Sequence, residues 1–462
     1  MNDWVVRSIV HLRRKRVSQS SSGRGRRNRR AANQPPSLLY LLFGITVFLS
    51  AFLLFQVQPI ISKAILPWFG GTPAVWTTAM FFFQIALLLG YCYAHLTTRF
   101  LSPAAQKWTH LAFCLAAVLL LPIGLEESTK PVGQVGTPAS TVFLLLLRSV
   151  GVPFLLLSTT APLVQVWWHR AFTSTPYKLY AVSNAGSLLA LLSYPFVVEP
   201  YVGLQRQMVW WSTIFFFVSC AIAYGSYRAA TGEATRVEDE AESDGSKPAW
   251  PTVALWLALS ACGSVLLLAM TNHITQNVAV IPFLWVAPLS IYLISFILSF
   301  SGRGYYRRWM YGSLMMASYM AAAYVYNAFG VTDNLGLILA IHLVALFAGC
   351  MVCHGELANA RPPAQYLTGF FVVTAAGGAL GGFLVSVASP FLFSAYHEYP
   401  LVLVSCVVLL LGISARDEQS RLCLRKSKIE GGRSSKTALY WLGVTICCFV
   451  FLVCLRNALV NN

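Results

Sequence analysis

Apolar stretches long enough to span a bilayer recur thirteen times along this chain of 462 residues. A helix needs about 20 apolar residues to cross the hydrocarbon core, where lipid offers its backbone no hydrogen-bond partners. The composition agrees, since 57% of the residues are apolar and only 11% are charged. The sequence therefore predicts an all-α, polytopic membrane protein with 12–13 transmembrane helices.

The predicted spans are least certain where a proline can kink or end a helix, at Pro153, Pro162, Pro195 and Pro288. The spans lie near residues 38–60, 74–96, 108–125, 141–163, 179–198, 209–227, 251–271, 282–300, 309–326, 335–353, 366–388, 400–413 and 438–455.

The basic residues predict the orientation of these spans. With the N-terminus inside, 28 of the 33 lysines and arginines fall on the cytoplasmic side and four on the outer side. This asymmetry follows the positive-inside rule, and one missed helix would invert every later loop. We therefore expect a multi-pass protein of the inner (plasma) membrane with a cytoplasmic N-terminus. The net charge of +17 is explained by orientation, so no nucleic-acid partner is expected.

Polar segments divide the chain into two six-helix halves with flanking parts. These parts are the basic tail 1–36, the first half 37–228, the acidic cytoplasmic linker 229–249, the second half 250–414, the basic loop 415–437, and the additional helix with the C-terminus, 438–462. The tail is expected to be disordered and cytoplasmic, unless it is a presequence or a start-site artefact. Two six-helix halves around a long inner loop resemble the arrangement of major-facilitator transporters.

A weak internal repeat agrees with two duplicated halves. The segment LYAVSNAGSLLA, from Leu179, aligns without gaps on FFVVTAAGGALG, from Phe370. The second segment contains overlapping G-x-x-x-G pairs, which are typical of closely packed membrane helices. The predicted helix-packing residues are Gly186, Gly377, Gly378, Gly381 and Gly382.

Polar side chains within the predicted spans are candidates for solute binding, because such groups are expensive in lipid. Gln56 and Gln58 lie in the first span, Gln84 in the second and Asn184 in the fifth. Arg148 is the only basic residue within a span, although a later helix start would leave it in an outer loop. For the first-span glutamines the alternative is hydrogen bonding that holds the helices together.

The sequence GCMVCHGE holds Cys350, Cys353 and His354 in the order of a c-type haem site. The predicted topology places it on the cytoplasmic side, opposite to where such haem is attached. A metal site that includes Glu356 is an alternative, since positions i, i+3 and i+4 share a helix face. We favour ordinary helix-end packing and expect no metal and no cofactor. No catalytic constellation stands out, so no enzyme activity is expected.

Four segments of the chain carry a family resemblance. They are FQVQPIISKAILPWFGGTPAVWTTAMFFFQIALLLGYCYAH, LYAVSNAGSLLALLSYPFVVEP, CMVCHGELANARP and GGALGGFLVSVASPFLFSAYHEYPL. Together they resemble the membrane part of bacterial fused spermidine-synthase-like proteins, in which a major-facilitator-like region precedes a cytoplasmic aminopropyltransferase-like domain. The likeness runs from about Leu38 to the last span, without the synthase-like domain. It implies a membrane module that partners, binds or moves something related to such chemistry.

Two functions of different classes remain open. The first is a transporter-like module for a small solute, with a midplane cavity between the halves. Because Glu199, Glu356 and Glu398 sit at span ends, a cationic polyamine would meet no carboxylate inside the membrane. The alternative is a non-transporting scaffold or anchor for a separate spermidine-synthase-like subunit, or a truncated fusion protein. In each case the lipid bilayer is a partner.

Overall fold

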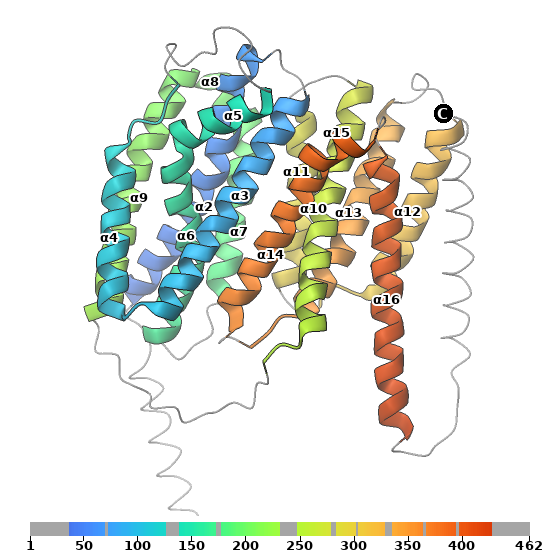
Figure 1. Cartoon of the computed structure of the whole chain (residues 1–462). Coiled ribbons are helices and arrows are strands. Elements are labelled where there is room, and N and C mark those ends of the chain that lie inside the picture. Colours follow the sequence, from blue (N-terminus) through green and yellow to red (C-terminus); the bar gives the residue numbers. More distant parts are fainter. Residues whose placement is uncertain are drawn as a thin grey trace, which may run out of the picture.

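The computed structural model describes residues 37–69, 73–125, 138–171, 177–231, 247–278, 283–301, 304–328, 335–363, 366–393 and 397–426. Within these ranges every regular element is a helix (Figure 1). The predicted basic tail, most of the acidic linker and the predicted helix near 438–455 lie outside the described residues.

The first half is a set of long helices that run up and down through the bundle, drawn in blue to green in Figure 1. They are α2 (Ser37–Ile65), followed by the short turn η1 (Leu66–Trp68), α3 (Pro73–Phe100), α4 (Pro103–Leu119), α5 (Pro138–Leu146) with α6 (Val152–Ala171), α7 (Tyr177–Ser193) with α8 (Glu199–Tyr201), and α9 (Leu204–Thr231).

The second half repeats this plan in yellow-green to red (Figure 1). Its helices are α10 (Trp250–Val278), α11 (Phe283–Ser301), α12 (Arg308–Ala328), α13 (Leu335–Asn359), α14 (Leu367–Phe383) with α15 (Ser389–Leu392), and α16 (Glu398–Lys426).

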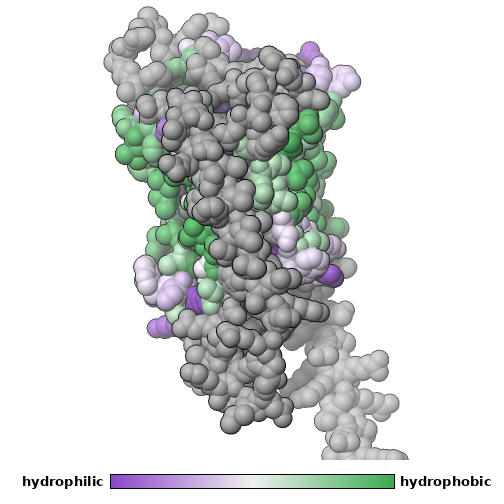
Figure 2. Space-filling view, turned by 90° about the vertical axis from the view of Figure 1, so that its right-hand side faces the viewer, coloured by the Kyte–Doolittle hydropathy of each residue, from purple (hydrophilic) through white to green (hydrophobic). Residues whose placement is uncertain are grey.

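The outer surface of the bundle is apolar, as a protein dissolved in lipid requires. Eight of the described helices are long and apolar enough to cross a membrane, and α11 adds the shorter apolar stretch Val286–Ser301. Large side chains such as Trp210 and Phe217 of α9 are exposed on the surface. In Figure 2 the coloured residues are mostly hydrophobic at mid-height, and hydrophilic residues gather near the top and bottom. The predicted all-α, polytopic fold is confirmed.

Three wide π-helical turns interrupt the long helices. They cover Leu147–Gly151 between α5 and α6, Tyr194–Val198 between α7 and α8, and Leu384–Ala388 between α14 and α15. Pro195 lies within one of these turns, and Pro153 follows another. A proline cannot donate the normal helical hydrogen bond, and a wider turn accommodates the interruption. These two prolines therefore interrupt the α-helical pattern without ending the spans.

The helices of the two halves pack in corresponding ways. In the first half α2 contacts α6, α7 and α9, and in the second half α10 contacts α13, α14 and α16 in the same order. The halves meet where α3 lies against α14 and where α7 lies against α11. Across the first of these seams His95 Nδ1 and Thr368 Oγ1 are 3.0 Å apart. The fold is thus two similar helix bundles joined along two seams.

Two glycines at corresponding places of the repeat bring the fifth span of each half against the first. A Cβ added to Gly186 of α7 would lie 2.5 Å from the Phe48 carbonyl oxygen of α2. A Cβ added to Gly377 of α14 would lie 2.6 Å from the Leu257 carbonyl oxygen of α10. Because both obstacles are backbone atoms, a side chain at either position would force the helices apart.

The remaining glycines of α14 face different neighbours. A Cβ on Gly381 would lie 2.7 Å from the Ala261 carbonyl oxygen, and one on Gly382 would collide with the Gln84 side chain of α3. Gly378 departs from the predicted packing role, because nothing lies within 4 Å of a Cβ built there. Space is left beside Gly378 because this residue lines a cavity between the two halves.

Candidate functional site

A cavity of about 240 Å³ lies between the two halves. Its wall is formed by α2, α3, α6 and α7 of the first half and by α10, α11, α13 and α14 of the second. These helices make up the first, second, fourth and fifth spans of each half. The cavity wall therefore follows the same repeat as the helix packing.

The cavity wall combines aromatic and aliphatic surface with uncharged polar groups. No aspartate, glutamate, lysine or arginine is found among the described residues that line it. The polar side chains are hydroxyls, amides and one imidazole: Ser50, Gln58, Gln84, Tyr91, Ser158, Gln165, Ser183, Asn184, Ser187, Ser260, Ser264, Tyr292, His354 and Thr374. Small-molecule sites in proteins commonly have this mixture of apolar surface and a few polar groups.

The predicted binding residues are distributed unevenly around this cavity. Gln58, Gln84 and Asn184 line it. Gln56 is buried on the same helix as Gln58 but is not part of the wall, because residues two apart on an α-helix point about 200° apart, towards nearly opposite sides. Arg148 departs from the predicted role, since it is exposed on the π-helical turn between α5 and α6 and does not line the cavity.

A chain of hydrogen bonds crosses from one half to the other at the cavity wall. Gln84 Nε2 of α3 donates to Ser264 Oγ of α10 at 2.9 Å, and Ser264 Oγ donates to the Gly378 carbonyl oxygen of α14 at 3.0 Å. Other buried polar atoms of lining residues have no partner among the described residues: Ser50 Oγ, Gln84 Oε1, Asn184 Nδ2, Ser260 Oγ and His354 Nε2. The wall thus holds hydrogen-bonding capacity that the protein itself does not use.

His354 is a lining residue that the sequence interpretation did not assign to a solute site. Its Nδ1 atom lies 2.9 Å from Ser295 Oγ, and its ring stands edge-on to the rings of Tyr292 and Phe296. These contacts hold the imidazole against α11. The available signal was a histidine in an apolar helix. The order of residues in GCMVCHGE suggested a haem site, which the predicted topology argued against, and ordinary helix-end packing was preferred instead.

The two ends of the cavity differ in how the halves meet. At the end where α2 and α10 finish, Trp76 and Leu191 of the first half belong to the same buried apolar cluster as Val286 of the second. At the opposite end the buried residues form separate clusters, one around Trp167 in the first half and one around Trp256 in the second. In the described residues the halves thus share an apolar cluster at one end of the cavity.

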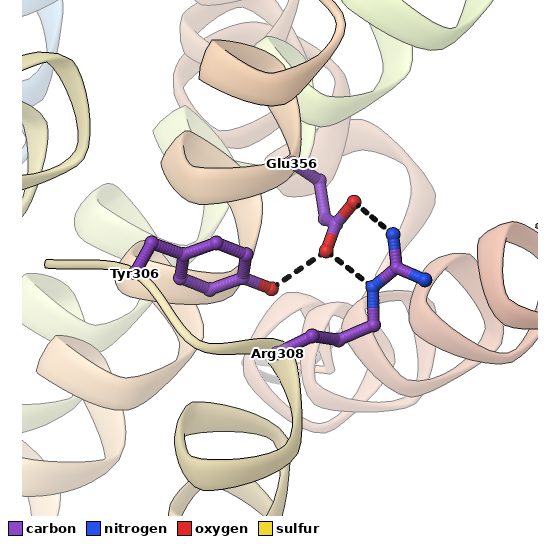
Figure 3. A network of polar contacts seen from close by, with 3 residues as sticks. All are labelled: Tyr306, Arg308 and Glu356. Atoms are coloured by element: carbon purple, nitrogen blue, oxygen red, sulfur yellow. Dashed lines mark hydrogen bonds and ion pairs between the residues drawn. The ribbon is translucent and has the colours of Figure 1, made fainter. Parts of the chain in front are cut away.

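Two ion pairs of the described residues, one in each half, lie outside the cavity wall. Glu356 of α13 receives two hydrogen bonds from Arg308, at the start of α12, and one from the Tyr306 hydroxyl (Figure 3). In the first half Lys63 Nζ lies 2.7 Å from Glu199 Oε1. Because Arg308 binds both carboxylate oxygens, Glu356 faces this arginine and does not join Cys353 and His354 as a metal ligand.

Comparisons with known proteins bear on the fold. No protein-family profile and no curated protein sequence matches this chain. Among solved structures, a double-tryptophan variant of XylE has a TM-score of 0.50 and 14% identity over 80% of this chain and 95% of its own. The inward-open xylose transporter XylE from E. coli has a TM-score of 0.48, 14% identity and the same shares. A variant of the nucleoside transporter NupG has a TM-score of 0.47 and 14% identity over 81% and 98%.

These identities are low, and the similarity concerns the arrangement of helices. The chain is a multi-pass α-helical membrane protein whose transporter-like fold is similar to that of major-facilitator transporters.

Proposed function

We propose that this protein carries a small, uncharged polar solute across the membrane by exposing its cavity alternately to the two sides. The observation that carries the proposal is a cavity between two repeated halves, lined by hydrogen-bonding groups that bear no formal charge. In transporters built from repeats, the solute site lies at the repeat interface and the halves rock around it. The proposal gives the chain no catalytic step.

The chemistry of the cavity wall favours polyhydroxylated or amide-bearing solutes. Removing a charged solute from water costs several kcal/mol unless an opposite charge receives it, and the described wall offers none. Hydroxyls of a solute would instead bond to groups such as Asn184 Nδ2 and Ser260 Oγ, at about 0.5–1.5 kcal/mol each. The rings of Tyr91, Tyr292 and Phe296 supply flat apolar contact. Pentoses and nucleosides have this combination of groups.

Transport should be measured with purified protein in liposomes, with labelled xylose and uridine as uncharged probes and labelled spermidine as a cationic probe. We expect flux of an uncharged probe above that of empty vesicles and none of spermidine. Replacing Asn184 with leucine removes one hydrogen-bonding group from the wall and should lower the flux roughly fivefold to tenfold. The matched control is Thr213→Leu, the same kind of change on the exposed face of α9, which should leave the flux unaltered.

A different result of this measurement would favour the alternative function. If neither uncharged probe moves, and no member of a wider set of uncharged polar solutes does, the transport proposal fails and a scaffold that anchors a separate spermidine-synthase-like subunit becomes the better account. Flux of spermidine would instead contradict the proposed solute class. The family resemblance to fused spermidine-synthase-like proteins motivates including this cation, whereas the uncharged wall argues against it.

We further propose that the cavity of this conformation faces the cytoplasm. The positive-inside rule predicts that the end of the bundle where α2 and α10 begin lies inside. The apolar cluster shared by Trp76, Leu191 and Val286 then closes the outer end. This proposal connects the predicted orientation with the unequal contacts between the halves.

Labelling of an introduced cysteine tests this orientation. In intact cells Glu238→Cys, in the acidic linker, should stay unreactive towards a maleimide that cannot cross the membrane, and it should react after the cells are opened. The background is the labelling of the native cysteines in the unaltered protein. Equal labelling before and after opening would place the linker outside, and the predicted orientation would then be wrong.

A further inference from the structure

Three thiols from distant parts of the sequence meet inside the second half. Cys262 of α10, Cys353 of α13 and Cys406 of α16 bring their Sγ atoms within 4.8 Å of one another. The sulfurs of Cys262 and Cys406 are 3.2 Å apart, and all three residues are free cysteines. Three helices therefore present one thiol each to a common point.

The surroundings of this three-thiol cluster are apolar and closed. The exposed fractions are 7% for Cys262, 1% for Cys353 and 0% for Cys406, and all three belong to the large buried cluster that also contains Leu266 and Met315. Among the described residues no histidine, carboxylate or fourth cysteine belongs to the group. The cysteine, histidine and carboxylate ligands that the described residues bring to this point are thus three sulfurs, and the Tyr319 hydroxyl lies beside Cys406.

We propose that the three-thiol cluster binds the soft monovalent ion Cu(I) in trigonal coordination. Thiolate sulfur is the ligand that selects Cu(I) and other soft metals. A metal about 2.3 Å from three coplanar sulfurs places them about 4.0 Å apart, which small side-chain rotations reach from the observed spacing. Zinc in structural sites takes four ligands, whereas the described group supplies three. Each thiol that becomes a thiolate ligand releases one proton.

His354 is the neighbour of Cys353 on α13 and also lines the cavity. Its Nε2 atom is without a partner in the described part of the chain. A Cβ on Gly263, beside Cys262, would lie 3.4 Å from His354 Nε2 and 3.8 Å from the Cys353 Cβ. The imidazole of His354 and the thiol-bearing residues Cys262 and Cys353 therefore lie close together.

Cu(I) in this position ties α10, α13 and α16 together within one half of the molecule. The inference stands apart from the proposed transport, because binding is measured on the resting protein without any solute. A failure of solute flux therefore leaves the metal proposal intact, and the reverse holds as well.

The test is a titration of the purified full-length protein with Cu(I), under reducing and oxygen-free conditions, against the chelator bathocuproine disulfonate. We expect one Cu(I) per chain with an ultraviolet thiolate-to-copper absorption band. Replacing Cys353 with alanine removes one ligand and should weaken binding by roughly a hundredfold or more. The matched control is Cys350→Ala, since Cys350 is equally buried on the same helix but lies outside the group, and binding should persist.

Several results would overturn the proposal. They are no Cu(I) retained against the chelator, equal binding by Cys353→Ala and the unaltered protein, and a Cys262–Cys406 disulfide found by counting thiols before and after reduction. If Cys353→Ala does not fold, Cys406→Ser provides the second variant, because serine keeps nearly the volume of cysteine. Undiminished Cu(I) binding by that variant would refute the site in the same way.

Discussion

Replacing Arg308 with alanine is expected to lower the free energy of unfolding by about 3 to 5 kcal/mol. Arg308 donates from Nη2 to Glu356 Oε2 at 2.6 Å and from Nε to Oε1, and the Glu356 side chain is only 3% exposed. Without the guanidinium the carboxylate stays buried with the Tyr306 hydroxyl as its remaining partner in this network. An uncompensated buried charge is what makes the loss large.

The measurement is thermal unfolding in detergent, followed with a thiol-reactive dye that reports exposure of the buried cysteines. Lys63→Ala is the matched control, because the ion pair of Lys63 with Glu199 is far less buried. The Lys63 side chain is 44% exposed and the Glu199 side chain 22%. Exposed pairs contribute at most about 1 kcal/mol, so this variant should unfold almost as the unaltered protein does. A similar loss in both variants would show that burial of Glu356 is not the cause.

Replacing Gly377 with alanine is expected to lower the free energy of unfolding by about 2 kcal/mol. The added methyl group would lie 2.6 Å from the Leu257 carbonyl oxygen and 2.6 Å from the Ser260 Cβ of α10. Since one of these obstacles is backbone, α14 and α10 must separate to admit it. The contact between α14 and α10 joins the fifth and first spans of the second half. The substitution therefore disturbs a central contact of that half.

The control for this variant is the neighbouring residue. Nothing lies within 4 Å of a Cβ built on Gly378, and alanine is about 1 kcal/mol more favourable than glycine in a helix. Gly378→Ala should therefore unfold at the same temperature as the unaltered protein or at a higher one. The two variants differ by one position, and a shift of both in the same direction would contradict the close approach at Gly377.

The fold was largely predictable because the apolar length of each span is a local property of the sequence. The span expected near 74–96 is the core of α3, Pro73–Phe100. Differences arise near helix ends, as where α4 stops at Leu119 although apolar residues continue to Leu125. The π-helical turns near Pro153 and Pro195 were outside the reach of prediction, since apolar length does not reveal how the backbone accommodates a proline.

The cavity was predictable only in part, because its lining depends on how each helix is rotated. Gln58 and Gln56 are equally polar, yet one lines the wall and the other does not. Arg148 attracted attention as a charge within a span, but no property of its neighbours in sequence reveals that its side chain is exposed.

The three-thiol cluster was hidden from the sequence for another reason. Cys262, Cys353 and Cys406 have no paired spacing, and singly each reads as a small apolar residue. They meet because α10, α13 and α16 pack together within one half. Only the tertiary arrangement reveals this group.

The unequal contacts at the two ends of the cavity have a consequence for the resting equilibrium of the empty protein. Opening the end closed by Trp76, Leu191 and Val286 would expose these side chains to water, at about 1.5 to 3 kcal/mol for each large apolar residue. In the proposed transport cycle, this cost favours the conformer that keeps this end shut when no solute is bound. A solute can reverse that bias only through tighter binding to the opposite conformer.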